Sequence, residues 1–178
     1  MNILLIGFMG TGKSTVSAVL AQRLGFRSVE MDEEIAAKAG MSIPEIFASE
    51  GEAGFRARET EELAAVLSGD GQVVSCGGGI VTRERNLSML RSAAASTVRL
   101  TASPEAVFER IGSDPGRPML KDVRGPEDMA RLMESREAAY RAAGGVEIAT
   151  DRKTPEEIAD EIMVRLGLSG SGNRSEEI

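Results

Sequence analysis

The segment at residues 7–14, which reads GFMGTGKS, constrains the fold of this chain more than any other feature. It matches the pattern G-x-x-x-x-G-K-[ST], in which glycines let backbone N–H groups turn inward around phosphate oxygens. An apolar run that predicts a strand, Asn2–Ile6, precedes it, and a segment of helical period at residues 15–24 follows it. A loop in this position also gains the positive end of the helix dipole. The sequence therefore predicts a nucleotide phosphate site within an α/β fold.

The residues of this loop have expected roles toward ATP and its metal ion. Lys13 is expected to bridge the β- and γ-phosphates, and Ser14 is expected to bind Mg²⁺ through its hydroxyl. The alternative, a glycine-rich turn that binds nothing, is disfavoured because a Lys-Ser pair, a strand and a helix all accompany the glycines. The expected contacts to ATP from the loop and the first helical turn are those of Gly10, Thr11, Gly12, Lys13, Ser14 and Thr15.

Strand and helix patterns alternate along the rest of the chain. Further strands are predicted at residues 27–31, 73–76, 97–101 and 146–150, and further helices at residues 59–67, 104–111, 127–142 and 155–166. This alternation predicts βαβ crossovers and a parallel sheet with helices on both faces. We expect one domain over residues 1–168, a three-layer α/β/α sandwich with a five-stranded parallel sheet.

Two segments are longer than simple connections require, and both are expected to lie over the ligand site. The first, residues 33–60, is predicted to be a substrate-binding excursion between the second and third strands. The second, residues 112–126, holds three glycines and three prolines together with basic side chains, which is typical of a mobile lid. Residues 169–178 lack an apolar period and are predicted to form a disordered tail.

Net charge, cysteine content and the apolar runs limit the kinds of partner and the cell compartment that we expect for this protein. Lys and Arg total 21 against 28 Asp and Glu, a net charge of -7, which disfavours binding to nucleic acid or to an anionic membrane. Cys76 is the single cysteine and cannot form an internal disulfide. The N-terminus lacks a basic segment with a cleavage site, and no apolar run approaches the about 20 residues of a membrane span. We expect a cytoplasmic protein and a monomer.

Carboxylates stand at the end of the predicted second strand. Asp32 follows this strand, where it could accept a proton from an attacking hydroxyl or orient that hydroxyl toward the γ-phosphate. The alternative is that Asp32 only caps a helix beginning at Glu33. The strand at residues 73–76 ends without an acidic residue, so Asp32 and Glu30 are also candidates for carboxylates around Mg²⁺.

Three consecutive glycines, Gly77, Gly78 and Gly79, follow the predicted third strand. Glycines in such a run bury no side chain, which suggests that another group approaches the backbone closely. Successive N–H groups there could also form an anion-binding nest. The alternative is a flexible turn.

Arg136 occupies an unusual position in the predicted helix at residues 127–142. It is expected to point inward as a buried guanidinium, which needs an anionic partner. That partner could be a ligand carboxylate or an internal one. The apolar stripe with which Arg136 is in phase consists of Met129, Leu132, Met133 and Tyr140.

Other arginines are candidates for ligand contacts. Arg56 precedes Glu59 by three residues, so Glu59 could hold its guanidinium, whereas Arg58 is expected to be solvated. Arg117, in the predicted lid, could bring positive charge to the transferring phosphoryl group. Arg110 could cover the nucleotide base or only complement the helix dipole.

The segments GFMGTGKST, MDEEI, FRARE, CGGGI, GRPML and LMESREAAYR, taken together, resemble shikimate kinases over residues 2–166. The resemblance implies the P-loop kinase fold of nucleoside monophosphate kinases, with a lid and the sheet order 2-3-1-4-5. It also implies ATP- and Mg²⁺-dependent phosphorylation of the 3-hydroxyl of shikimate, a step of aromatic amino acid biosynthesis.

The resemblance also implies residue roles. Asp32 would contact the reacting hydroxyl, and Lys13 and Arg117 would complete the catalytic set. Arg110 and the turn at Arg152 would flank the adenine. Shikimate would be bound by Asp32, Arg56, Arg136 and the backbone of Gly77, Gly78 and Gly79. One position departs from the family pattern D-x-D at the end of the second strand, because the first acid is Glu30.

Three other functions remain open on the sequence. A kinase of another small hydroxy or sugar acid, such as gluconate, would share the loop and the general fold. A nucleoside monophosphate kinase would need a pocket for a second base. A regulatory nucleotide-binding domain would not need Asp32 and Arg117.

Overall fold

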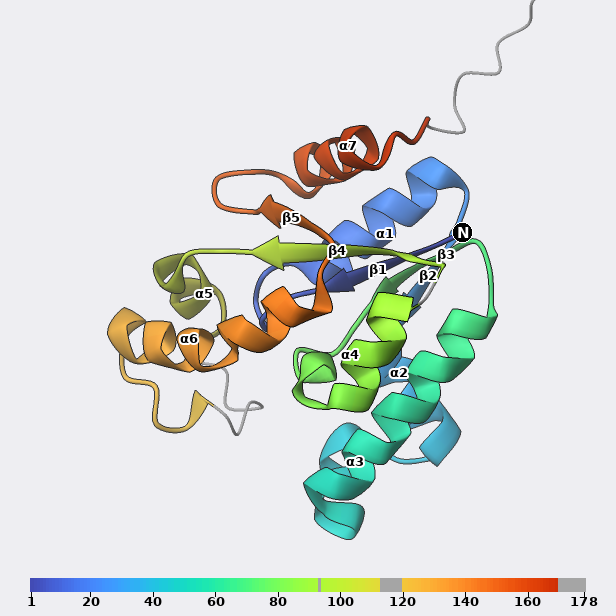
Figure 1. Cartoon of the computed structure of the whole chain (residues 1–178). Helices are drawn as coiled ribbons and strands as arrows, with labels where there is room; N and C mark the ends of the chain where they lie inside the picture. Colours follow the sequence, from blue (N-terminus) through green and yellow to red (C-terminus); the bar gives the residue numbers. More distant parts are fainter. Residues whose placement is uncertain (93, 113–119, 170–178) are drawn as a thin grey trace, which may run out of the picture.

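The computed structural model describes residues 1–92, 94–112 and 120–169. Residues 113–119 of the predicted lid, Arg117 included, and residues 170–178 of the predicted tail therefore lie outside the described residues. Five parallel strands form one sheet in the order β2-β3-β1-β4-β5 (Figure 1). They are β1 (Asn2–Ile6), β2 (Arg27–Glu30), β3 (Gln72–Ser75), β4 (Ser96–Thr101) and β5 (Val146–Ala149). The predicted five-stranded parallel sheet and the order implied by the resemblance are confirmed.

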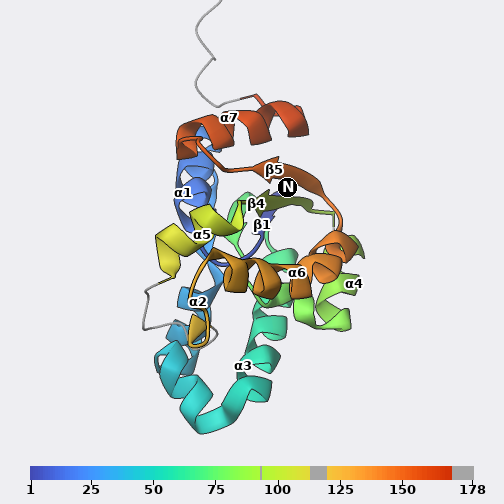
Figure 2. The same ribbon diagram turned by 90° about the vertical axis from the view of Figure 1, so that its left-hand side faces the viewer.

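Helices cover both faces of this sheet, which confirms the three-layer arrangement (Figures 1 and 2). One face carries α1 (Lys13–Leu24) and α7 (Pro155–Leu166), which pack against each other. The other elements are α2 (Met31–Ala39), α3 (Ile43–Ser68), η1 (Ile80–Thr82), α4 (Glu84–Ser92), α5 (Pro104–Ile111) and α6 (Pro126–Ala143). Of these, α3, α4 and α6 lie on the opposite face of the sheet from α1, and α2 packs against α3.

The segment after β2 differs from the predicted pattern. The prediction extended the second strand to residue 31, but β2 ends at Glu30 and α2 begins at Met31 without an intervening loop. The helix predicted at residues 59–67 is the last part of α3, which a capping box of Ser42 and Glu45 begins much earlier. A φ of 70° at Gly51 kinks α3, so this helix consists of two helical pieces that meet at the glycine.

Helix α4 was not predicted. Its sequence, ERNLSMLRS, is mostly polar, and only Leu87 and Leu90 among its residues belong to the buried core cluster. Tertiary contacts fix it in place: the Asn86 side-chain amide is fully buried, donates to the Ile80 carbonyl at 3.0 Å and accepts from the Thr60 hydroxyl at 2.8 Å. Thr60 lies 26 residues before Asn86, so a local pattern could not reveal this contact.

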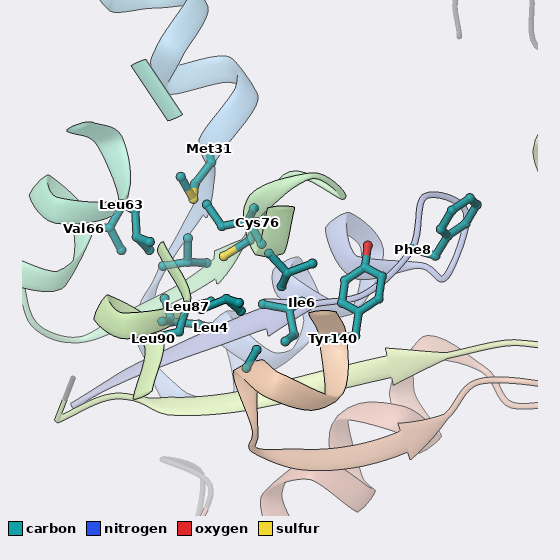
Figure 3. Packing of buried hydrophobic residues seen from close by; sticks show 14 of the residues in the cluster. Leu4, Ile6, Phe8, Met31, Leu63, Val66, Cys76, Leu87, Leu90 and Tyr140 are labelled. Atoms are coloured by element: carbon teal, nitrogen blue, oxygen red, sulfur yellow. The ribbon is translucent and has the colours of Figure 1, made fainter. Parts of the chain in front are cut away.

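Alternate residues of β1 fill the two cores on either side of the sheet. Ile3 and Leu5 pack with α1 and α7, whereas Leu4 and Ile6 pack with α3, α4 and α6 (Figure 3). Cys76 joins the second cluster as a buried free thiol, whose pKa burial raises to about 12. Strand β1 is buried on both faces, and this rigid centre of the sheet positions the loop that follows it.

Candidate active site

A cavity of about 270 Å³ opens at the carboxyl ends of β1, β2 and β3. It is lined by the phosphate loop, by Glu30 and Asp32, and by residues 75–78. Ligands of open parallel sheets bind at this edge. A larger hollow of about 390 Å³ is lined by Met1, Asp70 and their neighbours near the opposite ends of the strands, where none of the predicted site residues lies.

The phosphate loop has the geometry that its sequence predicts. Gly12 adopts a φ of 92° immediately before α1, a conformation that L-residues with side chains rarely adopt. Lys13 is buried, and its Nζ donates to the carbonyl oxygens of Gly7 at 2.9 Å and Phe8 at 3.0 Å. Thr11 Oγ1 also donates to Phe8, at 2.8 Å. The loop therefore holds its ammonium group at the place where the phosphates are expected.

Oxygen atoms from three elements meet beside Ser14, the expected Mg²⁺ ligand. Ser14 Oγ donates to Glu30 Oε2 at 2.9 Å and lies 3.4 Å from Ser75 Oγ at the end of β3. Burial raises the pKa of Glu30, and hydrogen bonds from Ser75 and Ser14 oppose this rise. Hydroxyl and carboxylate oxygens are the donors that Mg²⁺ prefers, so these residues fit that ion. No group of three or more His, Cys, Asp or Glu side chains suited to a metal occurs in the described ranges.

Ser75 is a site residue that the sequence analysis missed. It ends β3, the position at which an acidic residue was sought and not found. A hydroxyl at the carboxyl end of a central strand was the available signal. The Ser75 hydroxyl forms part of the polar environment of Glu30 and opposes the rise that burial causes in the pKa of that carboxyl group.

The structure contradicts the capping alternative for Asp32. Helix α2 begins at Met31 with Glu30 in the N-cap position, so Asp32 is the second helical residue and does not precede the helix. Its carboxylate faces the triple glycine instead: a Cβ placed on Gly77 would lie 3.2 Å from Asp32 Oδ1. Asp32 thus stands in the cavity wall, opposite the start of the glycine segment.

The triple glycine is needed because charged side chains approach its backbone, as predicted. A Cβ on Gly79 would lie 2.2 Å from Arg56 Nη1, and one on Gly77 would lie 2.8 Å from Glu59 Oε1. Side chains at these positions would displace the guanidinium and the carboxylate. The proposed anion-binding nest of N–H groups stays a prediction.

Arg56 and Glu59 form the pair that their spacing predicts. Arg56 Nη1 donates to Glu59 Oε2 at 2.9 Å, and Glu59 is fully buried. Burial raises the pKa of Glu59, and the charge of Arg56 opposes this rise. In the described part of the chain, Arg56 Nε and Glu59 Oε1 are buried without a hydrogen bond. Arg58, expected to be solvated, lies at the surface, where it makes two hydrogen bonds to Glu50.

Arg136 lies at the edge of the core and is only partly buried, so the expectation of a buried guanidinium was wrong. The apolar stripe is confirmed at its ends, Met129 and Tyr140, and Arg136 contacts Gly78, a residue that lines the cavity. Tyr140 Oη donates to the Gly78 carbonyl at 2.5 Å, and Arg136 Nη1 donates to the same oxygen at 3.4 Å. Burial raises the pKa of Tyr140 to about 12, although Arg136 and Arg99 oppose the rise.

Arg110 and Arg152 lie at the two segments predicted to flank the adenine. Arg110, in the last turn of α5, donates to the Gly10 carbonyl of the phosphate loop at 2.9 Å. Arg152 has a φ of 58°, the only positive value for a non-glycine residue in the described ranges. The neighbouring Asp151 accepts hydrogen bonds from the backbone and side chain of Ser103, which tie this turn to the start of α5.

Known proteins match this chain closely. A family model described as shikimate kinase matches residues 9–167. A shikimate kinase from Geobacter sulfurreducens is 46% identical over 161 residues, which cover 90% of this chain and 88% of that protein. The structure of a shikimate kinase from Acinetobacter baumannii in complex with shikimate is 34% identical, with a TM-score of 0.85 over 98% of this chain and 95% of that chain.

A gluconokinase structure from Sinorhizobium meliloti is more distant. It is 20% identical, with a TM-score of 0.59 over 93% of this chain and 91% of that chain, which shows a likeness of fold alone. The shikimate kinase model, by contrast, begins within the phosphate loop at residue 9 and includes the helix that carries Arg136 and Tyr140. The chain belongs to the shikimate kinase family.

Proposed function

We propose that this protein transfers the γ-phosphate of ATP to the 3-hydroxyl of shikimate, giving shikimate 3-phosphate and ADP. The observation that carries the proposal is the meeting of Arg56, Arg136 and Asp32 around the triple glycine, next to the phosphate loop. This arrangement offers guanidinium groups for a carboxylate and a carboxylate for a hydroxyl. Shikimate carries both the carboxylate and the hydroxyl groups that these side chains could bind, on one small ring.

At the acceptor side, Arg56 and Arg136 bind the shikimate carboxylate and ring hydroxyls in this proposal, together with the backbone of residues 77–79. Guanidinium groups suit this task because they can make two parallel hydrogen bonds to a carboxylate. Glu59 would hold the Arg56 guanidinium for this contact, through the hydrogen bond of 2.9 Å that Nη1 donates to it. Asp32 accepts the proton of the attacking hydroxyl or orients that hydroxyl toward the γ-phosphorus.

At the donor side, the phosphates lie in the loop of residues 10–15 in this proposal, with Lys13 against the β- and γ-oxygens. Mg²⁺, when bound, would neutralise the negative charge that develops on the phosphate oxygens of the leaving group. Ser14 would hold the ion directly, with Glu30 and Asp32 acting through water. Arg110 and Arg152 approach the adenine, and Arg117 supplies charge from the lid.

The nature of the phosphorylated product tests this proposal. The protein is incubated with ATP and Mg²⁺ and with shikimate or gluconate in parallel, and the products are examined by ³¹P–¹H correlation spectroscopy. We expect a phosphate coupled to the proton at position 3 of shikimate and little product from gluconate. Phosphate at another ring position, or preferential use of gluconate, would refute the assignment.

We also propose that residues 1–168 form one catalytic domain that acts as a monomer in the cytoplasm, with residues 33–60 on the acceptor side and residues 112–126 as the lid. We propose further that its partners are small molecules and include neither nucleic acid nor membrane. The net charge of -7 supports this part of the proposal. In the described ranges, no helix has the length and apolar character needed to cross a membrane. Light scattering after size-exclusion chromatography will measure the mass, which we expect to equal one chain.

Arg136→Lys is expected to raise KM for shikimate much more than KM for ATP, with little change in the melting temperature. The lysine keeps the charge but loses the planar guanidinium that can bind a carboxylate in two places. Michaelis curves for both substrates and a thermal melt check this. A large fall in melting temperature with equal changes in both KM values would instead mean that Arg136 serves an internal carboxylate.

Glu30→Asp is expected to be tolerated, with kcat reduced by less than about tenfold. The contact of Glu30 to Mg²⁺ is expected to run through water, and a water-mediated contact can adapt to a shorter side chain. The Mg²⁺ dependence of the rate should shift modestly. A much larger loss would show that the hydrogen bond between Glu30 and Ser14, 2.9 Å in this structure, sets the metal geometry directly.

A further inference from the structure

Arg99 is a charged residue in the middle of β4, a strand covered on both faces. Strands of this kind usually carry continuous apolar residues. Its neighbours Val98 and Leu100 follow that rule and pack beneath α1 and α7. Arg99 points to the other face, toward α6, and is only 8% exposed. The proposed roles in shikimate and ATP binding do not use this side chain.

Two carboxylates bind the Arg99 guanidinium. Nη1 and Nη2 donate to the two oxygens of Glu137 on α6, at 3.0 and 2.5 Å. Nη1 also donates to Glu147 at 3.0 Å, and Glu147 is the register partner of Arg99 on β5. Hydrogen bonding from Arg99 is the main reason that the pKa of Glu137 is lowered. We call Arg99, Glu137 and Glu147 the Arg99 cluster.

The Arg99 cluster lies directly behind the acceptor site. Arg99 Cζ is 5.4 Å from the centroid of the Tyr140 ring, which packs beside Ile6 in the core (Figure 3). Tyr140 follows Glu137 by three residues, so both lie on one face of α6. The same tyrosine donates to the Gly78 carbonyl, which Arg136 Nη1 also contacts. A chain of contacts therefore runs from β4 through α6 to the triple glycine.

Stability alone gives a weak reason for a guanidinium at this position. The guanidinium is buried, but its partners Glu137 and Glu147 are 36% and 61% exposed, so solvent screens these ion pairs and reduces their contribution to the free energy of folding. The two parallel hydrogen bonds to Glu137 instead fix how α6 is rotated about its axis relative to the sheet. A small rotation would move the Tyr140 hydroxyl and the Arg136 guanidinium away from Gly78 together.

We infer that Arg99 is a positioning residue for the acceptor site: by holding Glu137 and the Tyr140 ring, it sets where Tyr140 and Arg136 meet Gly78. The kinetic consequence rests on the proposed function. In Arg99→Met, we expect KM for shikimate to rise about tenfold, since a displacement on the order of 1 Å is enough for such losses. KM for ATP should change less than about twofold, because the described hydrogen bonds of the Arg99 side chain go to Glu137 and Glu147 and not to the phosphate loop.

Arg141→Met is the matched control. Arg141 follows Tyr140 in the chain and also binds Glu137, at 2.8 Å, but its side chain is 76% exposed and has no described contact with the Tyr140 ring or with β4. Its replacement should leave both KM values unchanged. Arg99→Met combined with Tyr140→Phe should raise KM for shikimate much less than the product of the two single effects, because both act through the same contact with Gly78.

Tyr140 is the only tyrosine of the chain, which permits a readout that does not depend on turnover. In protein labelled with ¹³C-tyrosine, the ring signals all arise from Tyr140. We expect these signals to shift in Arg99→Met and to shift much less in Arg141→Met, although Arg141 is the next residue in the chain. This measurement remains valid even if the wild-type protein fails to phosphorylate shikimate, an outcome that would overturn the proposed function alone.

Two results would overturn the positioning role. The first is an unshifted Tyr140 ring in a folded Arg99→Met protein with wild-type KM for shikimate. The second is a lowered melting temperature accompanied by equal increases in both KM values, which would assign Arg99 to structure only. Partial recovery of KM for shikimate in Arg99→Lys, which restores one charge but not the two parallel bonds, would support the role.

Discussion

Lys13→Ala is expected to reduce kcat by at least about 10²-fold, the scale for loss of a charge aimed at the transition state. The Lys13 ammonium is held inside the phosphate loop by the carbonyls of Gly7 and Phe8, at 2.9 and 3.0 Å. From this position we expect it to meet the β- and γ-oxygens and to neutralise their charge during transfer. Steady-state kinetics with saturating ATP and shikimate provide the measurement.

Lys38→Ala serves as the control for Lys13→Ala. Lys38 lies near the end of α2 and pairs with Glu62 on α3, away from the cavity. Its loss removes the same formal charge and should leave kcat unchanged. A Lys13→Ala protein that keeps nearly the wild-type kcat would show that the loop binds phosphate without acting on the transferred group.

Asp32→Asn is expected to lower kcat by roughly 10²-fold, the usual scale for a positioned acid–base group. Asparagine keeps the size of the side chain but accepts a proton poorly. Because Asp32 is the second residue of α2 and does not cap it, the stability change should stay within about 1 kcal/mol, the range for a charge near a helix N-terminus. Kinetics and a thermal melt of the same preparation separate the two effects.

The neighbouring Glu33 offers a matched control for Asp32. It is exposed in the same first turn of α2, so Glu33→Gln removes one negative charge from the same dipole environment. Its kcat should equal that of the wild type. Equal losses in both variants would mean that the charge of the turn, and not a contact with the acceptor hydroxyl, is responsible.

Local sequence predicted the parts of the site that depend on short-range spacing. The phosphate loop needs only a strand, its glycines and a helix in succession, and the ion pair of Arg56 with Glu59 needs only one helical turn. The close approach at residues 77–79 followed from the cost of three glycines. In the first two cases the signal and its structural partner lie within a few residues, whereas the groups that approach residues 77–79 belong to Arg56 and Glu59 on α3.

Contacts between distant segments were beyond the reach of local patterns. Ser75 joins the Ser14 and Glu30 pair only because β3 lies beside β2 and β1 in the sheet. Arg99 is an ordinary residue of a short strand until Glu137, 38 residues away, packs against it. Arg136 is partly exposed because the core does not cover every residue on its side of α6. Helical period gives the side of the helix on which a residue lies, but not how much of that side is covered.

The dependence of ADP release on the acceptor tests the central claim most directly. A coupled assay follows ADP formed by the wild-type protein with ATP and Mg²⁺, with shikimate varied from zero to saturation. The account predicts slow release without shikimate and a saturable rise with it, lost in Lys13→Ala. ADP release at the same rate with and without shikimate would contradict the account.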